Sequence, residues 1–80
     1  MSSANIPLQF EIYEDGKLLR TQVCTDQKIK IGRLSSSHLQ LMDDSVSRMH
    51  AVIEFQGDGV PVIQDLGSRQ KTFMNGSPIT

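Results

Sequence analysis

Lys28-Ile-Lys-Ile-Gly-Arg33 is the stretch that decides the fold. Its first four residues alternate charged and apolar side chains, which is the two-residue period of a β-strand with one face on a core. Ile29 and Ile31 would point inward. The glycine that follows is typical of a sharp change of direction at a strand end. The stretch therefore predicts a half-buried strand that delivers Arg33 into a loop at one end of a sheet.

The same alternation recurs on both sides of this stretch. Ala51, Ile53 and Phe55 would share the inner face of another strand. Further strands are expected at 8–13, 18–23, 39–41, 60–64 and 72–74, with Pro61 favouring a sheet edge. Glu14-Asp-Gly16 and Asn75-Gly76 are typical of hairpin turns. Because no segment has helical periodicity over ten residues, the pattern predicts an all-β fold, an antiparallel sandwich or barrel.

Length and charge limit the classes of function. Eighty residues are enough for one small domain with a modest core. Eight basic and nine acidic residues leave the chain near neutral, so it lacks the broad basic field of a non-specific nucleic-acid binder. A single cysteine rules out an internal disulfide, and no stretch approaches a membrane span. We expect a soluble, cytoplasmic protein without nucleic-acid or membrane partners, with residues 1–5 as a disordered tail.

The expected loops are rich in donors for an oxyanion. Guanidinium, hydroxyl and backbone N–H groups come together in Gly32-Arg33, Ser47-Arg-Met-His50 and Asp65-Leu-Gly-Ser68. Each of these residues also has a purely structural interpretation. Arg33 could form a surface ion pair with Asp43 or Asp44, and Ser47 could be a turn residue. The donor-rich loops favour a local site for a phosphate group.

The order and spacing of these motifs resemble the forkhead-associated (FHA) domain, a β-sandwich whose loops bind phosphothreonine peptides. The resemblance rests on Gly32-Arg33, Ser47-x-x-His50, Gly67-Ser68 and Asn75-Gly76, and it covers about residues 29–79. It implies that Arg33 and Ser47 bind the phosphate, because a planar guanidinium suits a pair of phosphate oxygens and a hydroxyl adds directionality.

The resemblance also assigns supporting roles. Arg48 would reach the phosphate or the peptide, although a solvated surface arginine is an equal alternative. His50 would brace the Ser47 loop from behind. The remaining structural positions are Gly32, Gly67, Ser68, Asn75 and Gly76.

The loop Ser68-Arg-Gln-Lys71 departs from the family pattern Gly-Ser-Thr-Asn-Gly-Thr. Arg69 stands where a threonine would contact the phosphate, and Gln70 stands where an asparagine would hold the peptide backbone. Gln70 is one methylene longer than asparagine, which changes the reach of its amide toward the peptide backbone. Lys71 occupies the glycine position, and a side chain there costs about 1–2 kcal/mol if φ must be positive. The loop adds two positive charges beside the expected phosphate site.

Other functions have weaker support in the sequence. Serines, His38, His50 and aspartates occur without a nucleophile elbow or oxyanion-hole motif, so an enzyme is not expected. No ligand spacing for a metal and no cofactor motif is present. The alternative function is a phosphate-independent interaction or self-association module on the same fold.

Members of the family normally continue with about two more strands beyond the position of Thr80. The resemblance therefore implies an FHA domain over residues 6–80 that is truncated before its last strands. Unpaired strands would leave open sheet edges. We therefore expect a homodimer or a strand swap through those edges.

Overall fold

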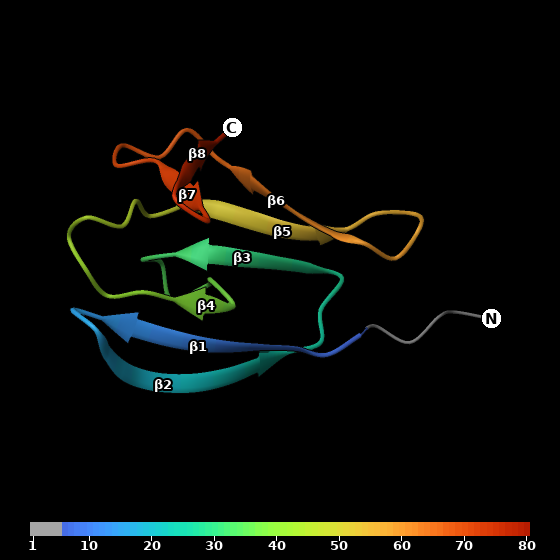
Figure 1. The fold of residues 1–80 in the computed structure, drawn as a ribbon, viewed down its shortest axis with the longest axis horizontal. Coiled ribbons are helices and arrows are strands. Elements are labelled where there is room, and N and C mark those ends of the chain that lie inside the picture. The colour runs from blue at the N-terminus through green and yellow to red at the C-terminus, as the bar shows by residue number, and fades with distance from the viewer. Residues whose placement is uncertain (1–5) are drawn as a thin grey trace.

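The computed structural model describes residues 6–80, and the expected tail of residues 1–5 lies outside this range. Within the described range the chain forms β-strands and no helix, as predicted (Figure 1). The eight strands are β1 (Leu8–Glu14), β2 (Lys17–Cys24), β3 (Lys28–Gly32), β4 (Leu39–Gln40), β5 (Ala51–Phe55), β6 (Pro61–Asp65), β7 (Thr72–Met74) and β8 (Ser77–Ile79). They form a hairpin β1-β2, a four-stranded sheet and a hairpin β7-β8.

The four-stranded sheet has the order β4-β3-β5-β6. Antiparallel pairing of β3 with β5 places Ile29 opposite Ile53, which puts their side chains on the same face. Strand β6 lies at the edge, where the missing N–H of Pro61 is tolerated. The pairing of β4 with β3 is parallel, which departs from the expected antiparallel arrangement. It involves two residues of each strand, Ile31 with Leu39 and Gly32 with Gln40.

The core lies between the β1-β2 hairpin and the four-stranded sheet (Figure 1). Its buried members are Cys24, Ile29, Leu39 and Ile53, and apolar residues of β1, β3 and β6 pack around them. Ile29 is fully buried, which stabilises the fold by about 1.5–3 kcal/mol relative to an exposed side chain. The sheet and hairpin thus form the two layers of the predicted sandwich.

Both predicted two-residue turns have the backbone of tight hairpins. Asp15 and Gly16 have φ of 52° and 79°, and Asn75 and Gly76 have φ of 53° and 86°. Two successive positive φ values match the right-handed twist of the flanking strands. The returning strand after Asn75-Gly76 is only three residues long, yet it pairs with all of β7.

Three connections gather at one end of the four-stranded sheet. Figure 1 shows the end of β3, the segment between β4 and β5, and the segment between β6 and β7 on the left, while the β5-β6 turn lies on the right. The left end carries the residues of the candidate site.

Within residues 6–80, no helix is long and apolar enough to cross a membrane.

Candidate functional site

Backbone hydrogen bonds hold the end of β3 against the segment 47–50. The Arg33 N–H donates to Ser47 O over 3.2 Å, and the His50 N–H donates to Ile31 O over 3.0 Å. A third, longer bond of 3.4 Å joins the Leu34 N–H to Arg48 O. Residues that are far apart in the chain are therefore neighbours, and Arg33 lies directly beside Ser47.

Gly32 permits this close approach. A Cβ on Gly32 would overlap with the backbone carbonyl oxygen of Arg48 and would lie 3.2 Å from Ser47 O. Both obstacles are backbone atoms, so they cannot move aside as a flexible side chain would. Gly32, which was expected to end the strand, therefore has a more specific role. It lets the end of β3 and the segment 47–50 come close enough for their backbones to form hydrogen bonds.

Ser47 connects this pair of segments to the loop after β6. Its Oγ accepts a hydrogen bond from the Arg69 N–H over 3.1 Å, and its side chain is half-buried. Since the hydroxyl acts as an acceptor in this bond, its own hydrogen is available to a ligand. The bond also fixes the backbone at Arg69 next to Ser47.

His50 braces the same two segments from one side. Its Nδ1 accepts from the Ser47 N–H over 3.0 Å, and its Nε2 lies 3.0 Å from Lys71 O. An Nδ1 that accepts carries no proton, so the proton of the neutral ring is on Nε2 and is donated to Lys71 O. The ring therefore links Ser47 to the loop 66–71 in one defined tautomer.

Asp65 organises the loop 66–71, a role that the sequence reasoning missed. Its Oδ2 accepts from the N–H groups of Gly67 and Ser68 over 2.9 and 3.0 Å. Its Oδ1 accepts from the hydroxyls of Ser68 and Thr72, the latter over 2.6 Å. The Ser68 hydroxyl, followed by that of Thr72, lowers the pKa of Asp65 from 3.8 to about 2. An aspartate followed by Gly-Ser two residues later is the signal that could have identified this turn.

Lys71 has a left-handed backbone, with φ of 70°. The glycine of the FHA pattern suggested a positive φ at this position. The backbone has that φ, with lysine in place of glycine. This conformation directs Lys71 O to His50 Nε2. A lysine in this conformation has an energetic cost relative to glycine.

The Arg33 side chain lies against the loop that precedes Ser47. Its Nε donates to Val46 O over 3.0 Å, and the side chain is half-buried. Within residues 6–80 no carboxylate lies within 4 Å of Arg33, so the alternative surface pair with Asp43 or Asp44 does not form. The rest of the guanidinium fork has no protein partner within this range.

The family model of the FHA domain matches residues 29–80 of this chain. The chain belongs to the FHA family. No curated protein matches the sequence closely enough to count as a relative.

Solved FHA structures share the fold at about one third sequence identity. One, from a study of phosphothreonine-dependent FHA domain interactions, is 33% identical with a TM-score of 0.69, covering 82% of this chain and 67% of the other. The FhaA FHA domain complexed with the intracellular domain of Rv3910 is 32% identical with a TM-score of 0.66, covering 81% and 67%.

A third solved structure is Mycobacterium tuberculosis EmbR in complex with a low-affinity phosphopeptide. It is 30% identical with a TM-score of 0.69. The match covers 82% of this chain but only 16% of EmbR. The similarity to EmbR is therefore limited to one part of that larger protein.

The structure also describes the other residues that the sequence predicted for the site. Arg48 and Arg69 are exposed and flank Ser47 through the bonds described above. Gln70 is exposed, and its amide makes no hydrogen bond within residues 6–80. Asn75 and Gly76 form the β7-β8 turn. The FHA loops thus bring Arg33, Ser47 and Arg69 together, while the roles of Asn75 and Gly76 are those of a turn.

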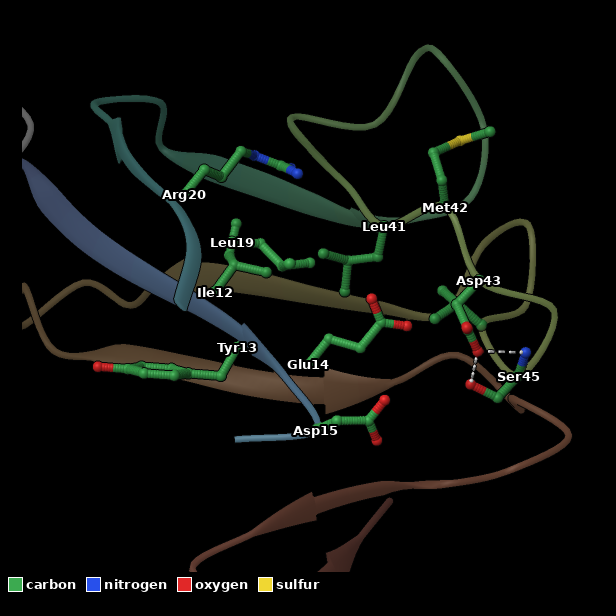
Figure 2. Close-up of a pocket in the computed structure, with 11 residues that line it drawn as sticks. Ile12, Tyr13, Glu14, Asp15, Leu19, Arg20, Leu41, Met42, Asp43 and Ser45 are labelled. Carbon is green, nitrogen blue, oxygen red and sulfur yellow. Dashed lines mark hydrogen bonds between the residues drawn. The ribbon is translucent and has the colours of Figure 1, made fainter. Parts of the chain in front are cut away.

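A groove of this FHA domain borders the segment that precedes Ser47, since Val46 is among its lining residues. It has a volume of about 430 Å³ and runs between the β1-β2 hairpin and the segment after β4. Figure 2 shows the carboxylates of Glu14 and Asp15 and the guanidinium of Arg20 among the lining side chains, with Asp43 hydrogen-bonded to Ser45. The Ser45 hydroxyl lowers the pKa of Asp43, which keeps that carboxylate charged. The three carboxylates outnumber the one guanidinium of the lining, that of Arg20, so the groove is a poor site for an anionic ligand.

Proposed function

We propose that this FHA domain binds proteins or peptides that carry phosphothreonine, and that Arg33 and Ser47 hold the phosphate. The observation that supports this most is the backbone hydrogen bond from the Arg33 N–H to Ser47 O, which makes the two residues neighbours at the end of β3. A phosphothreonine carries about −1.5 to −2 charges at neutral pH and three acceptor oxygens. The two side chains supply complementary donors.

The energies are sufficient for a regulatory interaction. Each charge-assisted hydrogen bond contributes about 1.5–3 kcal/mol net, and micromolar affinity requires about 8 kcal/mol. Two or three such bonds, with contacts to the peptide backbone, reach this range. Arg48 and Arg69 would assist through charge, and Gln70 would contact the ligand's main chain. We propose binding rather than catalysis for this site.

Matched peptides test the proposal. A pool of peptides with a fixed phosphothreonine and degenerate flanks should bind, and the pool with unmodified threonine should not. Arg33→Ala should weaken binding by about 2 kcal/mol, or roughly 30-fold, since a charged donor to the phosphate is lost. Titration calorimetry measures the affinity for each peptide pool and the loss of affinity in Arg33→Ala.

Arg20→Ala is the matched control. Arg20 also donates to a backbone carbonyl, that of Gln40, over 2.6 Å, but it lies on β2. This variant should keep its phosphopeptide affinity. Equal binding of the two pools by the wild-type domain would overturn the proposal in favour of phosphate-independent interaction, and unchanged affinity of Arg33→Ala would remove Arg33 from the site.

A further inference from the structure

Four basic residues lie on the segments that form the proposed phosphate site, and within residues 6–80 none of them forms an ion pair. Arg33, Arg48, Arg69 and Lys71 come from three segments that the bonds of Ser47 and His50 tie together. Within residues 6–80 the only ion pair within 4 Å is that of His38 with Asp26, which includes none of them. The whole chain has a formal net charge of −1, so this concentration of positive charge is local.

Asp65, the carboxylate in the site's own loop, forms no ion pair with these residues. Asp65 accepts four hydrogen bonds from Gly67, Ser68 and Thr72, and its charge is directed at these donors. On the segment before Ser47, Asp43 accepts from the Ser45 N–H and hydroxyl in the same way. Both carboxylates are engaged within their own turns.

A single phosphothreonine leaves part of the positive charge unmatched. Its phosphate carries about −1.5 to −2 charges, against four cationic side chains. Like charges gathered in one place repel each other unless a ligand or partner supplies the opposite charge. The arrangement is therefore better matched to a ligand with more negative charge than one phosphate.

Hydrogen bonds hold the backbone of Arg69 and of Lys71, although both side chains are exposed. The Arg69 backbone N–H is bonded to Ser47 Oγ, and Lys71 O is bonded to His50. The Arg69 side chain therefore starts from a defined position beside Ser47, and that of Lys71 from a defined position beside His50. A guanidinium offers a fork for an oxyanion, and an ammonium offers a point charge.

We propose that the ligand carries a second anionic group close to the phosphothreonine, and that Arg69 and Lys71 bind it. This inference rests on the proposed phosphothreonine binding. The shared chemistry is that of an oxyanion, either a carboxylate of an acidic residue or a second phosphate. Arg69 and Lys71 would thus act as specificity-determining residues of this chain.

Selection from peptide pools tests the inference. The wild-type domain is presented with phosphothreonine peptides whose flanking positions include neutral residues, Asp, Glu and phosphoserine, and the bound peptides are sequenced by mass spectrometry. Individual peptides with and without the selected anion are then titrated. We expect the second anion to strengthen wild-type binding about tenfold, the gain of one charge-assisted contact.

Two double variants locate the effect. In Arg69→Gln/Lys71→Gln the ratio of affinities for the two peptides should fall to about twofold or less, the level left by exposed charges elsewhere. In the control Lys28→Gln/Lys30→Gln, which removes two exposed cations of β3, the ratio should stay at the wild-type value. The ratio is the readout because Arg69 also belongs to the proposed phosphate site.

The outcomes separate the two proposals. Enrichment of Asp and Glu, or of phosphoserine, identifies the source of the second anion. Phosphothreonine-dependent binding without such enrichment, or a ratio unchanged in Arg69→Gln/Lys71→Gln, would overturn the second-anion inference and leave the proposed function intact. A folded domain that selects no phosphothreonine peptide would overturn the proposed function, and the inference with it.

Discussion

Lys71 combines a left-handed backbone with a long side chain, in the loop that is bonded to Ser47 through Arg69. The family's glycine at this position raised the question of positive φ from the sequence, and the φ of 70° answers it. Sequence reasoning could identify this strain because a glycine position has a simple steric meaning. It could not predict that His50 would bond to Lys71 O, since the two residues are 21 positions apart.

Lys71→Gly should stabilise the domain by about 0.5–1 kcal/mol. The variant relieves about 1–2 kcal/mol of left-handed strain, and the greater freedom of glycine in the unfolded chain offsets part of this gain. Urea unfolding measures the change. Arg69→Gly is the control in the same loop, because Arg69 has no positive φ, and it should destabilise the domain instead. Destabilisation by Lys71→Gly would contradict the assigned strain.

Asp65 makes the stability of the loop 66–71 dependent on pH. Its pKa is lowered to about 2 in the folded state, so its contribution is fully present above its ordinary pKa of 3.8 and is lost as the pH falls through about 2. Asp65→Asn should be less stable than the wild type at pH 7, because the amide has no negative charge and offers one acceptor oxygen instead of two to the four donors. The difference in unfolding free energy should narrow between pH 4 and pH 2.

Urea unfolding of both proteins at several pH values checks this expectation. The other carboxylates titrate in both proteins, so the difference between the two curves isolates Asp65. Curves that stay parallel from pH 4 to pH 2 would show that Asp65 does not hold the loop through its charge.

At the scale of elements, the long alternating strands and the two-residue turns could be predicted from the sequence. Strands β1, β3 and β5 have clear two-residue periods, and Asp15-Gly16 and Asn75-Gly76 have distinctive turn chemistry. The parallel pairing of β4 and the short strand β8 could not be derived, because two or three residues contain too little pattern to define a partner. These pairings depend on tertiary contacts.

The contact between β3 and the segment 47–50 is the element-level feature on which the site depends. Gly32→Ala should destabilise the domain by about 1–3 kcal/mol, the usual range for overpacking, and should weaken phosphopeptide binding because the Arg48 carbonyl must move away. Gly57→Ala is the control, since a Cβ there meets no atom within 4 Å and the backbone has no positive φ. Unfolding curves and peptide titrations that are unchanged in Gly32→Ala would contradict this role.

At the scale of the whole molecule, the packing of the β1-β2 hairpin on the sheet buries the only cysteine. Cys24 is 5% exposed, and burial, followed by the charge of Asp26, raises the pKa of its thiol. Both effects suppress the reactive thiolate. Iodoacetamide should alkylate Cys24 at least about 100-fold more slowly in the native protein than in urea, as expected when reaction requires an opening of about 3 kcal/mol. Similar rates would show that the two layers separate readily.

The proposed phosphate site lies at the end of β3, and the acidic groove lies between the β1-β2 hairpin and the segment after β4. Mapping of ¹H–¹⁵N chemical shifts during titration with the phosphothreonine peptide pool tests this most directly. We predict that the largest shifts occur together at Arg33, Ser47, Arg48 and Arg69. Shifts concentrated instead at Ile12, Leu19 and Met42, which line the groove in Figure 2, would contradict the central claim that the loops around Ser47 form one phosphate site.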